Sequence, residues 1–96
     1  MYGTAARLRV KPGMIGQLEE LSREWQSMTS AGLVSSIVYR MDADPNEVYL
    51  TVVFQDRDSY RANAEDSETD AKYRRMRELL EADPEWHDGE VIASAF

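Results

Sequence analysis

The sequence predicts an α+β fold in which two helices cover one face of a four-stranded antiparallel sheet. A nine-residue stretch from Glu47 to Gln55 (EVYLTVVFQ) is rich in β-branched and aromatic residues and lacks glycine and proline, which is typical of a strand. Stretches of strand type and of helical periodicity alternate in the order β-α-β-β-α-β. Proline, glycine, aspartate and asparagine separate several of them, as turns require.

We predict that the stretch Glu47–Gln55 is a central strand. One face carries Val48, Leu50, Val52 and Phe54, and the other carries Tyr49, Thr51, Val53 and Gln55. A strand with one face in water alternates apolar and polar residues, whereas both faces here are mostly apolar. The helices of a chain this short cover one face of the sheet, so we expect a second copy of the chain to cover the other.

The first half of the chain predicts a strand and a helix. Tyr2–Val10 forms the strand, and its better core face consists of Tyr2, Thr4, Ala6, Leu8 and Val10. Lys11-Pro12-Gly13 is a turn. Met14, Leu18, Leu21, Trp25 and Met28 recur at spacings of four and three, which predicts a helix with one apolar stripe. We expect Gly32 to end that helix in a left-handed cap.

The second half predicts a hairpin, a broken helix and a last strand. Leu33–Asp42 forms a strand, with Leu33, Ile37, Tyr39 and Met41 on one face, and Asp44-Pro45-Asn46 turns it into Glu47–Gln55. Helical segments follow from Asp58 to Ala64 and from a cap at Ser67 to Asp83-Pro84. Gly89 precedes a last strand, Glu90–Phe96. This order is that of a ferredoxin-like plait.

Composition limits the classes of function. With 96 residues, the chain is expected to form one domain, residues 1–96. The net charge of −7 makes nucleic acid and anionic membranes poor partners. The sequence has no cysteine, which excludes disulfides, thiolate metal sites and a cysteine nucleophile. No apolar run approaches a membrane span and the N-terminus lacks a signal-peptide pattern, so we expect a cytoplasmic protein.

Three segments carry a resemblance to a known family: KPG after the first strand, GLVSS at the second, and VVFQDRDSYRAN from the third strand into a helix. Together with the order of elements, they make the chain similar to the antibiotic biosynthesis monooxygenase family over nearly its whole length. The resemblance implies a homodimer whose two sheets face each other as an α/β barrel, with one pocket per subunit between sheet and helices. It also implies oxidation by dioxygen without a cofactor, because the substrate's own electron-rich ring or carbanion reacts with oxygen.

Two branches of that family can be compared residue by residue. The haem-degrading branch needs an Asn, a Trp and a His where this sequence has Ala6, Asn63 and Tyr73, so haem degradation is not expected. The branch that makes quinones from aromatic polyketide phenols has a Tyr and an Arg that fall on Tyr60 and Arg74. Its Trp at the strand end is Phe54 here, and Leu50 stands in place of its Asn.

The resemblance makes Tyr60 and Arg74 the candidate catalytic residues. A Tyr hydroxyl can hydrogen-bond a substrate oxygen, and an Arg can stabilise its negative charge. Both residues could instead have purely structural roles. The Tyr60 ring would then pack on the sheet with its hydroxyl in water, and Arg74 would lie on a solvated helix face. The candidate substrate-binding residues are Trp25, Phe54, Asn63 and Tyr73. Alternatively, Trp25 and Tyr73 are core residues and Asn63 caps a turn.

Small residues on the strands predict a cavity beneath the large aromatic side chains of the helices. They are Gly3, Thr4, Ala5, Ala6, Ser35, Ser36, Ala93, Ser94 and Ala95. If the aromatic residues fill that space instead, no pocket remains. No metal-ligand spacing is present, and His87 reads as an exposed loop histidine or a general base. The predicted function is a cofactor-independent monooxygenase acting on an aromatic or polyketide-like molecule, or else a non-catalytic ligand-binding or stress-related homodimer.

Overall fold

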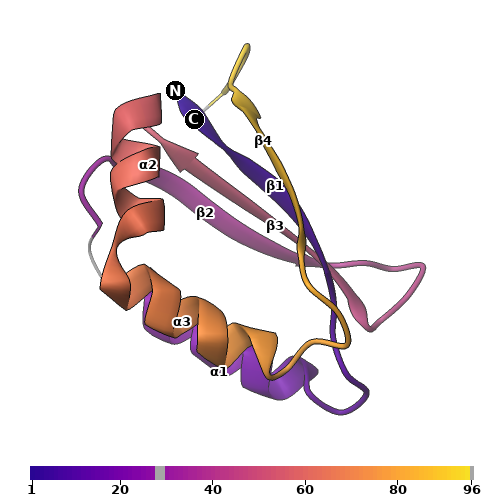
Figure 1. Ribbon diagram of the computed structural model, residues 1–96. Coiled ribbons are helices and arrows are strands. Elements are labelled where there is room, and N and C mark those ends of the chain that lie inside the picture. Colours follow the sequence, from indigo (N-terminus) through magenta and orange to yellow (C-terminus); the bar gives the residue numbers. More distant parts are fainter. Residues whose placement is uncertain (28–29, 96) are drawn as a thin grey trace.

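The computed structural model describes residues 1–27 and 30–95. Within these residues, three helices lie on one side of a four-stranded sheet (Figure 1). The elements in chain order are β1 (Tyr2–Arg9), α1 (Ile15–Gln26), β2 (Leu33–Arg40), β3 (Glu47–Phe54), α2 (Arg57–Glu65), α3 (Ser67–Arg77) and β4 (Glu85–Glu90). The predicted α+β class and the ferredoxin-like arrangement are therefore confirmed.

The sheet has the strand order β2-β3-β1-β4, and every neighbouring pair is antiparallel. β1 and β3 pair along their full length, from Tyr2 opposite Phe54 to Arg9 opposite Glu47. The prediction that the stretch Glu47–Gln55 is a central strand is correct, although the strand ends one residue earlier. The β2–β3 hairpin closes through Asp44, whose Oδ1 accepts the backbone N–H of Asn46 at 2.9 Å.

The core fills part of the space between the helices and the sheet. Its buried apolar residues are Ala6, Leu8, Val10, Leu18, Leu21, Val48, Leu50, Met76 and Leu80. Seven of the nine come from the predicted core faces of the first and third strands and from the predicted stripe of α1, so those patterns are confirmed. Met76 lies on α3, and Leu80 lies just after it. Met28, the last predicted member of that stripe, lies outside the described residues.

The other face of the sheet carries no helix (Figure 1). Its apolar side chains include Ile37, Tyr39 and Tyr49, which are 43%, 46% and 38% exposed. Tyr39 and Tyr49 are direct cross-strand partners, so their rings lie next to each other in the sheet. We call this surface the open face; it is the apolar second face that the sequence predicted.

The prediction of a last strand over Glu90–Phe96 is wrong for residues 91–95, and Phe96 lies outside the described residues. The chain instead pairs with β1 through β4, from Arg7 opposite Glu85 to Tyr2 opposite Glu90. All six residues of β4 are exposed, and this edge strand lacks the apolar alternation that would have revealed it. His87 consequently lies within a strand and not in the loop before one.

Three smaller predictions also need correction. Gly32 has the expected positive φ of 80°, but it lies in the turn before β2, because α1 already ends at Gln26. Asp66, not Ser67, caps α3, since its side chain accepts the backbone N–H of Glu68 at 2.8 Å. A β-bulge between Leu33 and Ser35 changes the phase of β2. Leu33 therefore shares the helix side with Val38 and not the face of Ile37.

Replacing Gly3 by Ala is expected to lower the free energy of unfolding by about 1–3 kcal/mol, as overpacking does. A Cβ on Gly3 would overlap the backbone carbonyl oxygen of Val52 in the centre of the sheet, where neither strand can move away freely. Gly89, the cross-strand partner of Gly3, offers a matched control because a Cβ there meets no atom within 4 Å. Urea denaturation of both variants measures the difference; equal stabilities would contradict the prediction.

Candidate active site

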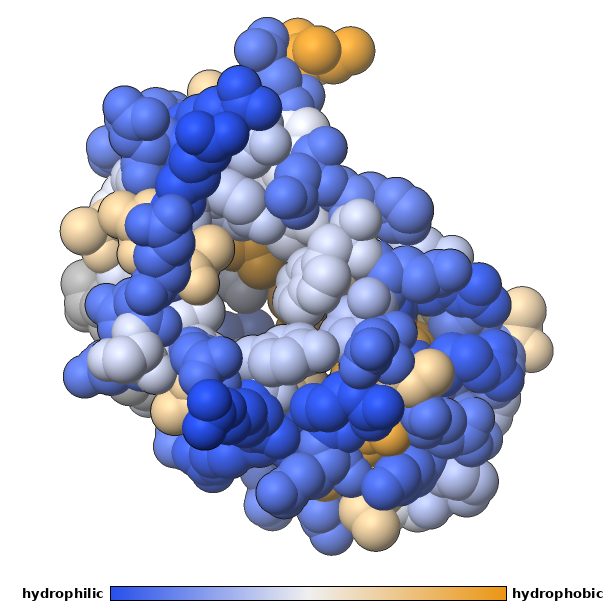
Figure 2. Space-filling model, viewed as in Figure 1, coloured by the Kyte–Doolittle hydropathy of each residue, from blue (hydrophilic) through white to orange (hydrophobic). Residues whose placement is uncertain are grey.

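A cavity of about 540 Å³ lies between the sheet and the helices. Figure 2 shows the molecule hollowed between α2, α3 and the sheet, with apolar atoms deep in the hollow. Its apolar lining includes Leu33, Leu50, Val52, Phe54 and Met76, and its polar lining includes Thr4, Ser36, Tyr60, Asn63, Lys72 and Asp88. The predicted cavity is therefore present. Of the small residues that predicted it, Thr4 and Ser36 contribute to its wall.

Tyr60 reaches this cavity from α2. The helix begins in a capping box, in which the Asp56 side chain accepts the N–H of Ser59 at 2.8 Å. The Tyr60 ring packs edge-on against Tyr2 and Phe54, with centroid distances of 5.2 and 5.8 Å. Its hydroxyl donates a hydrogen bond of 2.8 Å to Asp88 Oδ1. The Tyr60 hydroxyl is thus held by a protein carboxylate and does not simply face water.

Burial, together with the hydrogen bond to Asp88 and the negative charge of Asp88, raises the pKa of Tyr60 to about 12. The nearby Thr4 hydroxyl lowers the pKa of Tyr60 and so offsets part of this increase. The two hydroxyls do not form a hydrogen bond of normal geometry. Tyr60 therefore keeps its proton at neutral pH. In this site it acts as a hydrogen-bond donor and not as a phenolate base.

Asp88 is the site residue that the sequence reasoning missed. It lies on β4 directly opposite Thr4 of β1, and the Asp88 side chain lines the cavity. Trp86 lies two residues earlier on the same face, opposite Ala6. The spacing of Trp86 and Asp88 on either side of His87 fits a strand with one face toward a pocket. This spacing lies outside the predicted last strand, which begins at Glu90, whereas β4 begins at Glu85.

Two hydrogen-bonding groups at the cavity have no partner among residues 1–27 and 30–95. Thr4 Oγ1 and Trp25 Nε1 are both buried without a hydrogen bond, and the Thr4 residue is only 8% exposed. Leaving a buried polar group unsatisfied costs about 1–3 kcal/mol. Both residues line the cavity, Thr4 from β1 and Trp25 from α1. A ligand with an acceptor oxygen would satisfy the Trp25 N–H, which can only donate.

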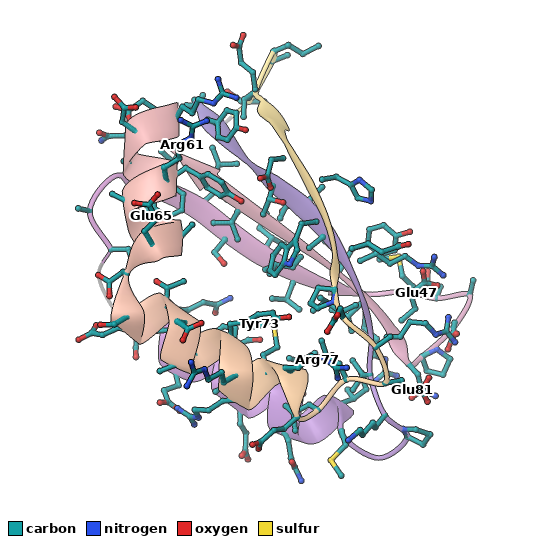
Figure 3. The ribbon with its side chains drawn as sticks, in the orientation of Figure 1. Glu47, Arg61, Glu65, Tyr73, Arg77 and Glu81 are labelled. Atoms are coloured by element: carbon teal, nitrogen blue, oxygen red, sulfur yellow. The ribbon has the colours of Figure 1, made fainter. Side chains whose placement is uncertain are left out.

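The other predicted substrate-binding residues also line the cavity. Phe54 forms part of its wall at the end of β3, and Tyr73 points from α3 toward the sheet (Figure 3). The Tyr73 ring lies 6.3 Å from the ring of Trp86. Asn63 both lines the cavity and makes a local contact at a turn, the two alternatives that were predicted for it. Its Oδ1 accepts a hydrogen bond of 3.3 Å from the Thr69 hydroxyl across the α2–α3 junction.

Arg74 does not reach the cavity with Tyr60. Its side chain is 78% exposed and pairs with Asp70, one turn earlier on α3, at 2.9 Å. Tyr73, the preceding residue, faces the cavity, and adjacent positions on a helix point in directions about 100° apart. The catalytic role expected of Arg74 remains a prediction without a contact that supports it. Lys72 is the cationic residue at the cavity wall within the described chain.

In residues 1–27 and 30–95, no three His, Asp or Glu side chains gather as a metal site would require. None of the helices described is long and apolar enough to cross a membrane. A smaller hollow of about 400 Å³ lies beside α1 and is lined by Leu18, Arg23, Val38 and Arg40, among others.

Comparison of the sequence with known protein families finds one match. The family described as antibiotic biosynthesis monooxygenase matches residues 1–82. No curated protein sequence matches the chain.

Solved structures share the fold at low sequence identity. One is a variant of SnoaB, a cofactor-independent oxygenase from Streptomyces nogalater (TM-score 0.84, 15% identity, 97% of this chain and 94% of that one). A protein from Chloroflexus aurantiacus J-10-fl that bears the family name has a TM-score of 0.82 at 23% identity, over 99% and 96% of the two chains. A conserved protein from Methanosarcina mazei Go1 has a TM-score of 0.81 at 16% identity, over 92% and 89%.

Proposed function

Because this chain belongs to the antibiotic biosynthesis monooxygenase family, we propose that it is a cofactor-independent monooxygenase acting on an aromatic or polyketide-like small molecule. The observation that carries the proposal is the cavity itself. It combines apolar and aromatic walls with a Tyr60–Asp88 hydrogen-bonded pair and two unpartnered polar groups. Its volume of about 540 Å³ lies within the range of small-ligand sites.

The proposed reaction uses dioxygen as its only oxidant. An activated CH₂ group of the substrate loses a proton, and the carbanion forms a bond to one oxygen atom of dioxygen. Return of the proton gives a hydroperoxide. Loss of the second carbon-bound hydrogen as a proton, with cleavage of the O–O bond, leaves a new carbonyl group and one water molecule. The carbon gives up four electrons, which are the four that dioxygen takes up.

The protein's part in this reaction is to bind the flat substrate and to hold its anion. Phe54, Tyr73 and Trp86 supply apolar and aromatic walls for the rings. The neutral Tyr60 hydroxyl donates its one hydrogen to Asp88, so it orients the substrate by accepting a hydrogen bond from a substrate O–H. Lys72 at the wall provides a positive charge toward a developing anion.

The working form is proposed to be a homodimer in which the open faces of two chains cover each other. The exposed Ile37, Tyr39 and Tyr49 give this face the apolar character of an interface. The same residues then meet across a two-fold axis, as in other symmetric dimers. The cavity lies on the opposite side of the sheet, so that each chain keeps its own site.

Oxygen uptake by the purified chain, without added cofactor, tests the proposed activity on a panel of anthrone-like and naphthol-like phenols. Uptake is expected in proportion to protein, and Tyr60→Phe is expected to reduce it about 10²–10³-fold, because it removes the hydroxyl that holds both Asp88 and the substrate. Tyr39→Phe is the matched control, because it removes a hydroxyl from the open face. Binding of the panel without any oxygen uptake would contradict the proposal and indicate a ligand-binding protein.

A further inference from the structure

We propose that Asp88 is the general base of the site, and that Trp25 Nε1–H and Thr4 Oγ–H together hold the substrate oxygen that becomes negatively charged. The inference rests on the monooxygenase function proposed above and assigns residues to its first step.

The position of Asp88 suits a base. Its Oδ1 accepts the Tyr60 hydroxyl at 2.8 Å, which fixes the carboxylate at the cavity wall. Among the hydrogen bonds of the described residues, none involves Oδ2, so that atom is available to take a proton. Opposite Asp88 on β1, Thr4 places its buried hydroxyl at the same part of the wall.

The other titratable groups nearby do not fit this role. Tyr60 keeps its own proton, because burial and Asp88 raise its pKa. His87 lies next to Asp88 in the sequence, but alternate residues of a strand point to opposite faces, so its side chain belongs to the open face. Asp70 lines the cavity as well, yet its carboxylate is paired with Arg74 at 2.9 Å.

Trp25 and Thr4 are suited to stabilise the oxygen of the resulting anion. Both polar atoms are buried, and neither has a hydrogen-bond partner in the part of the chain that the structure describes. They approach the cavity from α1 and β1, on two different layers of the fold. The indole N–H can only donate, so it selects a carbonyl or an oxyanion and not a second donor. Donors already in place at such an oxygen stabilise the charge as it develops.

The step is a proton transfer. A carbon–hydrogen bond of the substrate breaks, the proton binds to the Asp88 carboxylate, and the electron pair delocalises onto the substrate carbonyl oxygen. Trp25 and Thr4 hydrogen-bond that oxygen. After the carbanion has reacted with dioxygen, the proton on Asp88 returns to the bound peroxide. Asp88 is then ionised again, and no further reactant is needed.

Hydrogen–deuterium exchange isolates this step from oxygen chemistry. Anthrone is incubated with the full chain in D₂O under anaerobic conditions, and deuterium at its CH₂ group is followed by mass spectrometry. Asp88→Asn, which keeps an acceptor oxygen for Tyr60, is expected to lower the exchange rate about 10²–10⁴-fold. Trp25→Phe is expected to lower it about 10²–10³-fold. Glu90→Gln removes the same charge from the same strand outside the cavity lining, and its rate should equal that of the wild type.

The outcomes separate the inference from the proposed function. Equal exchange by the wild type and Asp88→Asn would overturn Asp88 as the base. Oxygen uptake by the wild type without any exchange would overturn the proton-transfer step and leave the monooxygenase proposal intact. Absence of both uptake and exchange would overturn both. Thermal unfolding shows whether each variant is folded. If Asp88→Asn does not fold, the exchange rate of a folded Trp25→Phe still tests the proposed stabilisation of the substrate anion, and a rate equal to that of the wild type would overturn it.

Discussion

Replacing Phe54 by Ala is expected to lower the free energy of unfolding by about 3–5 kcal/mol, the usual cost of deleting a buried aromatic side chain. Phe54 is only 1% exposed and lies at the junction of β3, β2 and α2. Its ring packs against that of Tyr60 at 5.8 Å, so the substitution also removes the support of the catalytic candidate. The new void would join the existing cavity, because Phe54 is part of the cavity wall.

Urea denaturation measures the change in stability, and ligand affinity measures the change in the cavity. Phe54→Leu is the graded control, since it keeps most of the apolar volume and should cost about 1.5 kcal/mol or less. If Phe54→Ala were as stable as the wild type, the contact between β3 and α2 would not be a principal part of the folded state.

Replacing Ile37 by Lys is expected to separate the proposed dimer. Ile37 is 43% exposed in the single chain and lies on the open face. In a two-fold dimer the new charge is buried twice, once from each chain. One unpaired charge at an interface costs about 2–5 kcal/mol, which alone corresponds to a rise in Kd of roughly 30-fold to several thousand-fold, and the second charge raises the Kd further. Sedimentation equilibrium at micromolar concentration gives the Kd directly.

The matched control is Ala62→Lys, which adds the same charge at an exposed position of α2. Its Kd should equal that of the wild type. A wild-type chain that is a compact monomer at micromolar concentration would contradict the dimer. It would leave the cavity and its proposed chemistry unaffected, because these lie on the other side of the sheet.

The order of the elements, the central strand and the apolar stripe of α1 could all be predicted from the amino-acid order. These features depend on hydrophobic periodicity, which each segment carries within its own residues. The cavity could be anticipated for a related reason: small residues such as Thr4 and Ser36 lie on strands, and large residues such as Trp25 lie on helices. The exposed apolar open face followed from the two apolar faces of one strand.

The proposed pairing of Tyr60 with Asp88 could not be found in this way. Asp88 lies on an exposed edge strand whose six residues, EWHDGE, show no apolar alternation, so its pairing depends on backbone hydrogen bonds with β1. The contact of Asp88 with Tyr60 joins residues 28 positions apart. Arg74 matches the family position in sequence, yet one residue of helical rotation separates it from Tyr73 and directs it to solvent. Local patterns report which face of a segment is apolar, whereas the meeting of polar groups from separate segments depends on strand register and helix rotation, which packing sets.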